Sequence, residues 1–138
     1  QLAIDARGLP VKNAVAGLPA EQFFCPGSIV RLDVDPLQPI GFGMLPQNAA
    51  FFSFSSAYDV TPGPDVRVVA RYGAKDILMS GWLEGEQAIA GRAAVVEARA
   101  GLGRAVLIGF RAQHRGQSMA TFRLLFNALL TSGGDQKR

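Results

Sequence analysis

The chain has 138 residues, of which 49% are hydrophobic and 18% charged, and its formal net charge at pH 7 is +3. This length and composition are typical of one globular domain, and no apolar run approaches the roughly 18 residues of a membrane-spanning helix. A single cysteine, Cys25, excludes an internal disulfide, and a single histidine, His114, leaves too few ligands for a usual His/Cys zinc site. We therefore expect no membrane span and no metal site in these residues.

The first half of the chain predicts short elements separated by Pro and Gly. Residues 1–27 predict an irregular lead-in, in which 11–16 and 20–24 could form short helical pieces. Residues 28–35 alternate between apolar and polar side chains, which predicts a half-exposed strand with Val30, Leu32 and Val34 on one face. Residues 40–44 are too broken by prolines for a regular element.

Three more elements follow before the most informative stretch. Strands are predicted over 49–55, 66–72 and 77–83, with a Pro/Gly loop over 59–65. A one-turn helix is predicted at 87–90.

The stretch 91–130 predicts a β-hairpin, a basic loop and a helix. Two aliphatic runs, 93–98 and 104–110, flank a short glycine-bearing connection, as in a hairpin. Residues 118–130 predict a helix, with Ser118 as its N-cap and Ser132, Gly133 and Gly134 ending it. Its apolar residues recur at helical spacing and predict a stripe buried on the sheet that contains Val95, Val106 and Ile108. The residues of the stripe are Phe122, Leu125, Phe126 and Leu129.

These elements predict a single α/β domain in which strands outnumber helices. The core is expected over 28–130 and a tail over 131–138. A complete doubly wound sheet alternates strands and helices, and that alternation is missing here. Since the chain also begins with Gln1 and has no signal-like segment, we interpret it as a fragment of a longer protein.

Charge is distributed unevenly along the chain. Residues 1–90 carry six Lys/Arg and nine Asp/Glu, whereas residues 91–138 carry eight Lys/Arg and two Asp/Glu. The basic end favours an anionic partner. The arginines are nevertheless spread over strands, turn and helix without an interleaved aromatic pattern, so we do not expect nucleic-acid binding.

Four residues near the expected start of the last helix form the candidate ligand site: Arg111, His114, Arg115 and Gln117. Free helix amides and positive charge favour an anion there, such as a carboxylate or a phosphate. The alternative, which we favour, is that these charges are solvated or paired with acidic side chains such as Glu84 or Glu86.

Other chemistry-bearing residues favour structural roles. Cys25 precedes Pro26, Gly27 and a strand, so it lacks the strand-to-helix elbow of a nucleophilic cysteine and is expected to be a buried or half-buried apolar residue. The carboxylate pairs Glu84/Glu86 and Asp33/Asp35 fit solvated strand edges better than catalytic or metal sites. Trp82 is expected to cover the edge of the core rather than to form a sugar platform.

The chain resembles the C-terminal region of bacterial secreted zinc carboxypeptidases of the M14 peptidase family. The segments that carry the resemblance are GWLEGE, AGRAAVVE, GRAVLIGFR and FRLLFNALL. The resemblance runs from about residue 8 to 130. It implies the strand-rich back part of a class I glutamine amidotransferase-like, flavodoxin-like domain, and a secreted or periplasmic location. It also implies that zinc is held by an upstream peptidase domain and not by these residues. In the amidotransferase pattern a Glu stands two residues after the catalytic His, but His114 is followed by Gly116.

The resemblance therefore implies a non-catalytic accessory domain, with no catalytic residues of its own, that packs on the peptidase domain of the same chain or binds substrate. One alternative is a module that binds an anionic or peptide ligand through the loop 111–117. A less favoured alternative is a residual cysteine hydrolase or amidotransferase that uses Cys25 or His114.

Overall fold

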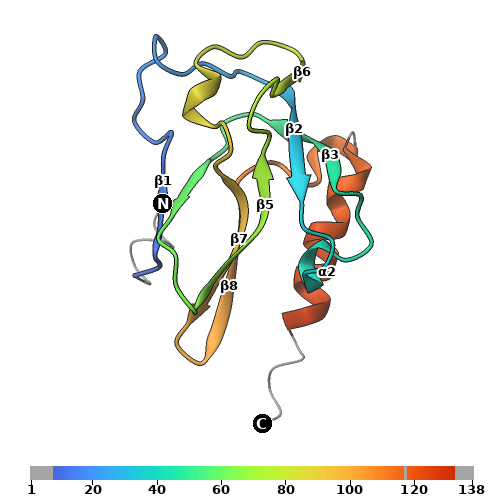
Figure 1. Cartoon of the computed structure of the whole chain (residues 1–138). Helices are drawn as coiled ribbons and strands as arrows, with labels where there is room; N and C mark the ends of the chain where they lie inside the picture. Colours follow the sequence, from blue (N-terminus) through green and yellow to red (C-terminus); the bar gives the residue numbers. More distant parts are fainter. Residues whose placement is uncertain (1–7, 117, 133–138) are drawn as a thin grey trace.

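A computed structural model describes residues 8–116 and 118–132 (Figure 1). Within them, eight strands form one sheet and a single α-helix follows at the C-terminal end. The strands are β1 (Val11–Asn13), β2 (Ser28–Val34), β3 (Gln47–Phe52), β4 (Tyr58–Val60), β5 (Val66–Tyr72), β6 (Leu78–Ser80), β7 (Ala93–Ala100) and β8 (Gly103–Ile108), and the helix is α2 (Phe122–Ser132). Short 3-10 turns span Pro39–Gly41, Glu86–Ala88, His114–Gly116 and Met119–Thr121.

The sheet is antiparallel at every pairing in the described part of the chain, in the order β1-β4-β7-β5-β2-β3. Two strands lie off this path: β6 pairs with β2, and β8 pairs with β7. The coarse prediction of a strand-rich domain with a C-terminal hairpin and helix is therefore confirmed.

Alternating burial confirms the predicted strand at the start of the core. Val30, Leu32 and Val34 of β2 are buried, whereas the residues between them are partly exposed. The strand predicted over 66–72 coincides with β5, and β3 covers the first part of the strand predicted over 49–55. The alternation of 28–34 and the β-branched and aromatic composition of the other two segments thus predicted the central strands.

The helical pieces expected in the lead-in are wrong. Residues 11–13 form β1, because the apolar side chain of Val11 is buried together with Tyr58 when β1 pairs with β4. The loop predicted over 59–65 also differs at its start, because residues 59 and 60 belong to the strand β4. The segment 20–24 is not helical but turns toward a single bridge between Phe24 and Glu84. Such short edge elements depend on partners distant in sequence.

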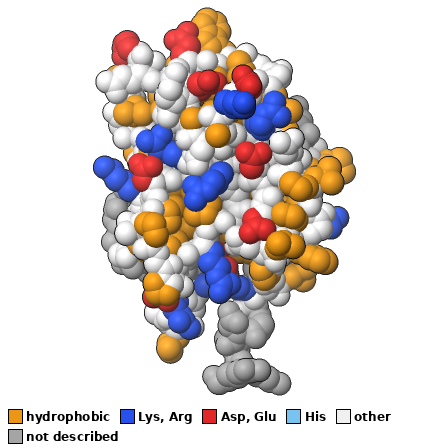
Figure 2. Space-filling model, viewed as in Figure 1, with side chains coloured by type: hydrophobic (Ala, Val, Ile, Leu, Met, Phe, Trp, Pro, Cys, Tyr) orange, Lys and Arg blue, Asp and Glu red, His pale blue; other side chains and the backbone are white. Residues whose placement is uncertain are grey.

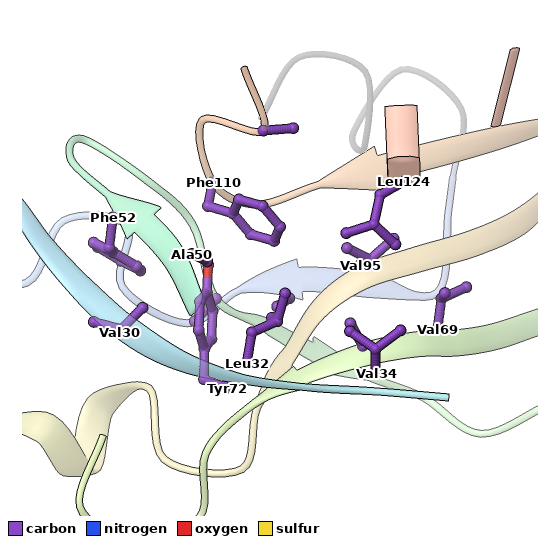
Figure 3. Packing of buried hydrophobic residues seen from close by; sticks show 14 of the residues in the cluster. Val30, Leu32, Val34, Ala50, Phe52, Val69, Tyr72, Val95, Phe110 and Leu124 are labelled. Atoms are coloured by element: carbon purple, nitrogen blue, oxygen red, sulfur yellow. The ribbon is translucent and has the colours of Figure 1, made fainter. Parts of the chain in front are cut away.

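The main core lies between one face of the sheet and the helix. Figure 3 shows Leu124 of α2 pointing toward Val95 of β7, with Phe110 beside them and the β2 side chains across the core. Leu124 has 0% of its surface exposed. A second, smaller cluster on the other face contains Leu9, Val11 and Tyr58.

The predicted buried stripe of the last helix is wrong by about one helical position. Leu124 faces the core, whereas Phe126 and Leu129 are 56% and 61% exposed. Each residue turns a helix by about 100°, so a shift of one position selects a different face. Asn127 fixes this orientation by donating hydrogen bonds from Nδ2 to the carbonyl oxygens of Ile40 and Phe42, at 2.9 and 3.0 Å.

The expected N-cap also differs. Ser118 precedes the 3-10 turn Met119–Thr121, and its side chain makes no capping hydrogen bond. Instead, the buried Thr121 donates from Oγ1 to the carbonyl of Ala112 at 2.7 Å. Residues 133 and 134, which were expected to end the helix, lie outside the described residues.

The buried Tyr72 should make the folded chain less stable in alkaline solution. Its buried hydroxyl donates a hydrogen bond of 2.8 Å to the carbonyl of Ser56. Burial raises the pKa of Tyr72 well above the ordinary 10.0, and Tyr58 and Cys25 raise it further. An unfolded tyrosine loses its proton near pH 10 while folded Tyr72 keeps it, so the unfolded state binds fewer protons above that pH. The free energy of unfolding should therefore fall as pH rises above about 10.

Denaturant titrations at several pH values measure this slope, and Tyr72→Phe should make it shallower. Ultraviolet titration of the folded chain provides a second readout, because burial raises the pKa of Tyr58 as well. Two tyrosines ionising together at pH 10 in the folded chain would contradict this prediction.

Candidate functional site

The candidate site is the loop between β8 and α2. Phe110 and Ala112 are buried and anchor this loop to the core, while Arg111 between them points outward. The hydrogen bond from Thr121 to the carbonyl of Ala112 ties the loop to the start of the helical region. Buried and exposed side chains thus alternate over residues 110–113, after the end of β8.

Arg111 and His114 are both held against the end of β3. The backbone N–H of Arg111 donates to the carbonyl of Phe51 at 3.3 Å, and its Nε donates to the carbonyl of Ser53 at 3.2 Å. The imidazole of His114 stacks on the ring of Phe51, with the ring centroids 4.2 Å apart and the planes at 17°. Phe51 is therefore a site residue that the sequence analysis missed. The alternation of β3, which turns Phe52 inward, could have indicated that Phe51 faces out.

Arg115 has an exposed side chain and a left-handed backbone, with φ of +46°. Such a conformation is uncommon for a residue other than glycine, and Gly116 follows with φ of +70°. Gln117, the fourth predicted site residue, lies outside the described residues. The structure thus brings Arg111, His114 and Arg115 together around one open hollow of about 560 Å³. The hollow is lined by Ile108, Phe110, Arg111, Ala112, Gln113, His114, Arg115 and Leu125.

Positive charge at this loop is not neutralised by a carboxylate of the described residues. Ion pairs lie elsewhere: Arg92 with Asp59 at 2.8 Å, Arg104 with Glu97 at 2.6 Å, and Arg99 with Asp65 at 3.6 Å. The expected alternative pairing of Arg111 and Arg115 with Glu84 or Glu86 is therefore wrong. Glu84 instead accepts a hydrogen bond from the indole N–H of Trp82 at 3.0 Å.

Cys25 is half-buried, as the sequence predicts, and its thiol lies 3.8 Å from the carbonyl oxygen of Phe52. Burial raises the pKa of the Cys25 thiol, against smaller lowering effects from Ser28 and Gly27. A raised thiol pKa reduces the thiolate fraction at neutral pH and makes a weak nucleophile. The chain continues from Cys25 into β2 and not into a helix, so Cys25 does not stand at a strand-to-helix elbow.

Trp82 does not cover the core. Its side chain is 60% exposed and meets Phe24 edge to face, with centroids 6.3 Å apart. The prediction that it lies over the edge of the core is therefore wrong. Among the described residues, no group of three or more His, Cys, Asp or Glu side chains is arranged to hold a metal ion.

A second candidate surface is the outer face of α2. Besides Phe126 and Leu129, the exposed apolar side chains here include Leu130 of the helix and Phe42 and Leu45, which follow the turn Pro39–Gly41. Figure 2 shows hydrophobic side chains gathered on the side of the molecule where α2 lies in Figure 1. Large contiguous apolar surfaces of this kind mark interaction sites in soluble proteins.

A comparison with protein-family models and a comparison with curated proteins both found no match. No helix in the described ranges is long and apolar enough to cross a membrane.

Proposed function

We propose that this chain is a non-catalytic accessory domain that docks onto a neighbouring domain through the outer face of α2. One observation carries the proposal: Phe126 and Leu129 are apolar at helical spacing and yet exposed. A helix in an ordinary domain turns such a stripe to the core. Exposing these side chains is unfavourable in water, so burying them against a partner would stabilise the assembly by about 1.5–3 kcal/mol for each fully buried side chain.

The resemblance in sequence suggests what the neighbour is. A C-terminal, amidotransferase-like domain in a secreted or periplasmic zinc carboxypeptidase-like protein would pack on its peptidase domain, orient it or help to bind its substrate. Zinc and the hydrolytic centre would then belong to that peptidase domain. The gene sequence upstream of the Gln1 codon provides a first check. An H-x-x-E motif with a more distant second His supports this context, and its absence contradicts it.

Binding in trans tests the docking face itself. The 138-residue chain should bind the peptidase-type domain encoded upstream, and the double variant Phe126→Ser/Leu129→Ser should bind at least about tenfold more weakly, since buried anchor residues carry most of an interface's binding energy. Isothermal titration calorimetry measures the change. The matched control is Met79→Ser, at an apolar side chain of β6 that is 50% exposed and lies outside the α2 surface. Equal affinity for the wild type and the double variant would contradict the proposal.

A second candidate function is the binding of an anionic or peptide ligand at the loop after β8. The observation that favours it is the hollow beside Arg111, His114 and Arg115, two of which are arginines without a carboxylate partner among the described residues. A carboxylate or phosphate would offer these side chains charge-assisted hydrogen bonds. The same surface would then sense a peptide C-terminus near the peptidase domain.

Titration separates this candidate from solvated surface charge. Phosphate or a dipeptide with a free C-terminus should bind the wild-type chain in a salt-dependent way, and Arg111→Ala and Arg115→Ala should each weaken binding about tenfold, the effect of losing a charge-assisted contact. Arg99→Ala, on the distant hairpin, is the control. No binding, or the same affinity in all variants, would leave these arginines as solvated charges.

A further inference from the structure

The outer edge of β8 presents backbone groups that no strand of the described chain pairs with. The N–H of Gly109 donates to the carbonyl of Ala94, so these two residues form a hydrogen-bonded pair of the β7–β8 hairpin. In an antiparallel pair such residues alternate along each strand. Leu107 therefore bonds to β7, whereas Val106 and Ile108 direct their N–H and C=O groups away from it. Among the described residues, β7 is the only strand that pairs with β8.

This edge lacks the features by which proteins protect exposed strands. Exposed edges are usually guarded by charges, proline, bulges or a covering segment. In β8 the register with β7 is continuous, and the single charged residue, Arg104, already forms an ion pair with Glu97. The rest of the strand is Ala, Val, Leu and Ile after the first glycine.

Both faces of β8 are apolar, although none of its residues is fully buried. Val106 and Ile108 pack on the main core, whereas Ala105 and Leu107 pack on the cluster around Val11 and Tyr58. Apolar side chains on both faces are typical of strands inside a sheet that is covered on both sides. On the helix side, Leu125 of α2 borders the same hollow as Ile108. A strand added beside β8 would therefore extend both apolar layers.

We infer that the open edge of β8 receives an extended apolar β-strand from the domain onto which this one packs, so that the sheet continues across the interface. This inference rests on the proposed docking function and names the structural element that docks. Backbone hydrogen bonds to Val106 and Ile108 would supply the affinity, and apolar side chains at alternate positions would fit the two faces. Because Arg104 is already ion-paired and the other residues of β8 are uncharged, an apolar strand fits this edge better than a charged one.

Amide hydrogen exchange of the 138-residue chain tests strand addition directly. In the chain alone, the amides of Ala105 and Leu107 should be protected and those of Val106 and Ile108 should exchange freely. The probe is a short peptide of alternating threonine and valine with a lysine at each end. At saturation it should slow the exchange of Val106 and Ile108 by at least about tenfold, as a formed hydrogen bond does.

Two controls isolate the backbone of the edge. The same peptide methylated on every backbone nitrogen should give no protection. Val106→Pro removes a donor that points away from β7 and should abolish the protection of Ile108, whereas Val106→Ala keeps the donor and should retain it. If Val106→Pro fails to fold, the methylated peptide still decides the matter.

Four results of the exchange experiment would overturn the inference: protection of Val106 in the dilute chain alone, protection that grows with chain concentration and a dimeric mass, no protection by the peptide, or protection by the methylated peptide. The second result would make a second copy of the chain the occupant. The upstream domain provides a further test. If Phe126→Ser/Leu129→Ser abolishes binding to that domain but Val106→Pro leaves it unchanged, strand addition is contradicted while docking through α2 is supported. Absence of all binding to that domain would contradict the docking function.

Discussion

Replacing Leu124 by alanine should lower the free energy of unfolding by about 2–5 kcal/mol, as large-to-small substitutions in closed cores do. Leu124 is the one leucine of α2 that is fully buried, and it points to Val95 across the core (Figure 3). The substitution removes apolar contacts and leaves a cavity under the helix. Chemical denaturation of the wild type and the variant measures the loss.

The matched control lies on the same helix. Leu129→Ala removes the same atoms from an exposed position and should change the free energy of unfolding by less than about 0.5 kcal/mol. Similar losses for Leu124→Ala and Leu129→Ala would mean that the helix is turned differently from the orientation described here.

Gly109→Ala should destabilise the chain by roughly 3 kcal/mol, at the upper end of the usual cost of overpacking. A methyl group at Gly109 would run into the backbone carbonyl oxygen of Ser56 and would lie 3.1 Å from that of Ala94. The Ala94 oxygen accepts a hydrogen bond from the N–H of Gly109, and the Ser56 oxygen accepts one from the hydroxyl of Tyr72, so neither backbone atom can move aside cheaply. Thermal and chemical unfolding should both report the loss.

Gly63→Ala is the control for Gly109→Ala. Gly63 lies in an exposed loop with nothing within 4 Å of an added methyl group. Alanine there restricts the unfolded chain and should be neutral or stabilising by about 0.4–1 kcal/mol. A tolerated Gly109→Ala would contradict the close approach of the loop before β4 to the end of β8.

Sequence patterns predicted the central fold because those elements carry their own signals. The alternation of β2, the valine-rich β5 and the glycine-containing hairpin of β7 and β8 are local features. The strands β1 and β4 were missed because three residues give no clear period, and their pairing depends on contacts distant in sequence. The orientation of α2 was missed because apolar spacing does not distinguish a core-facing stripe from an exposed one.

The candidate site rests on basic residues that follow a predicted strand. The structure places Arg111, His114 and Arg115 around one hollow, and their role in binding stays a prediction. The alternation of β3 could indicate that Phe51 faces outward, but not that the His114 ring stacks on it, because the two residues are distant in sequence. Likewise, the partners of Glu84 and Glu97 depend on the register of the strands, which composition does not specify.

Hydroxyl-radical footprinting of Phe126 tests the docking face most directly, because it compares the 138-residue chain with the longer protein from which we propose that it comes. Phe126 is exposed in the chain alone and should be oxidised readily there. In the longer protein its oxidation should fall several-fold, as burial in an interface requires, while that of Trp82 should stay the same. Equal oxidation of Phe126 in both proteins would contradict the proposal that the outer face of α2 is a docking surface.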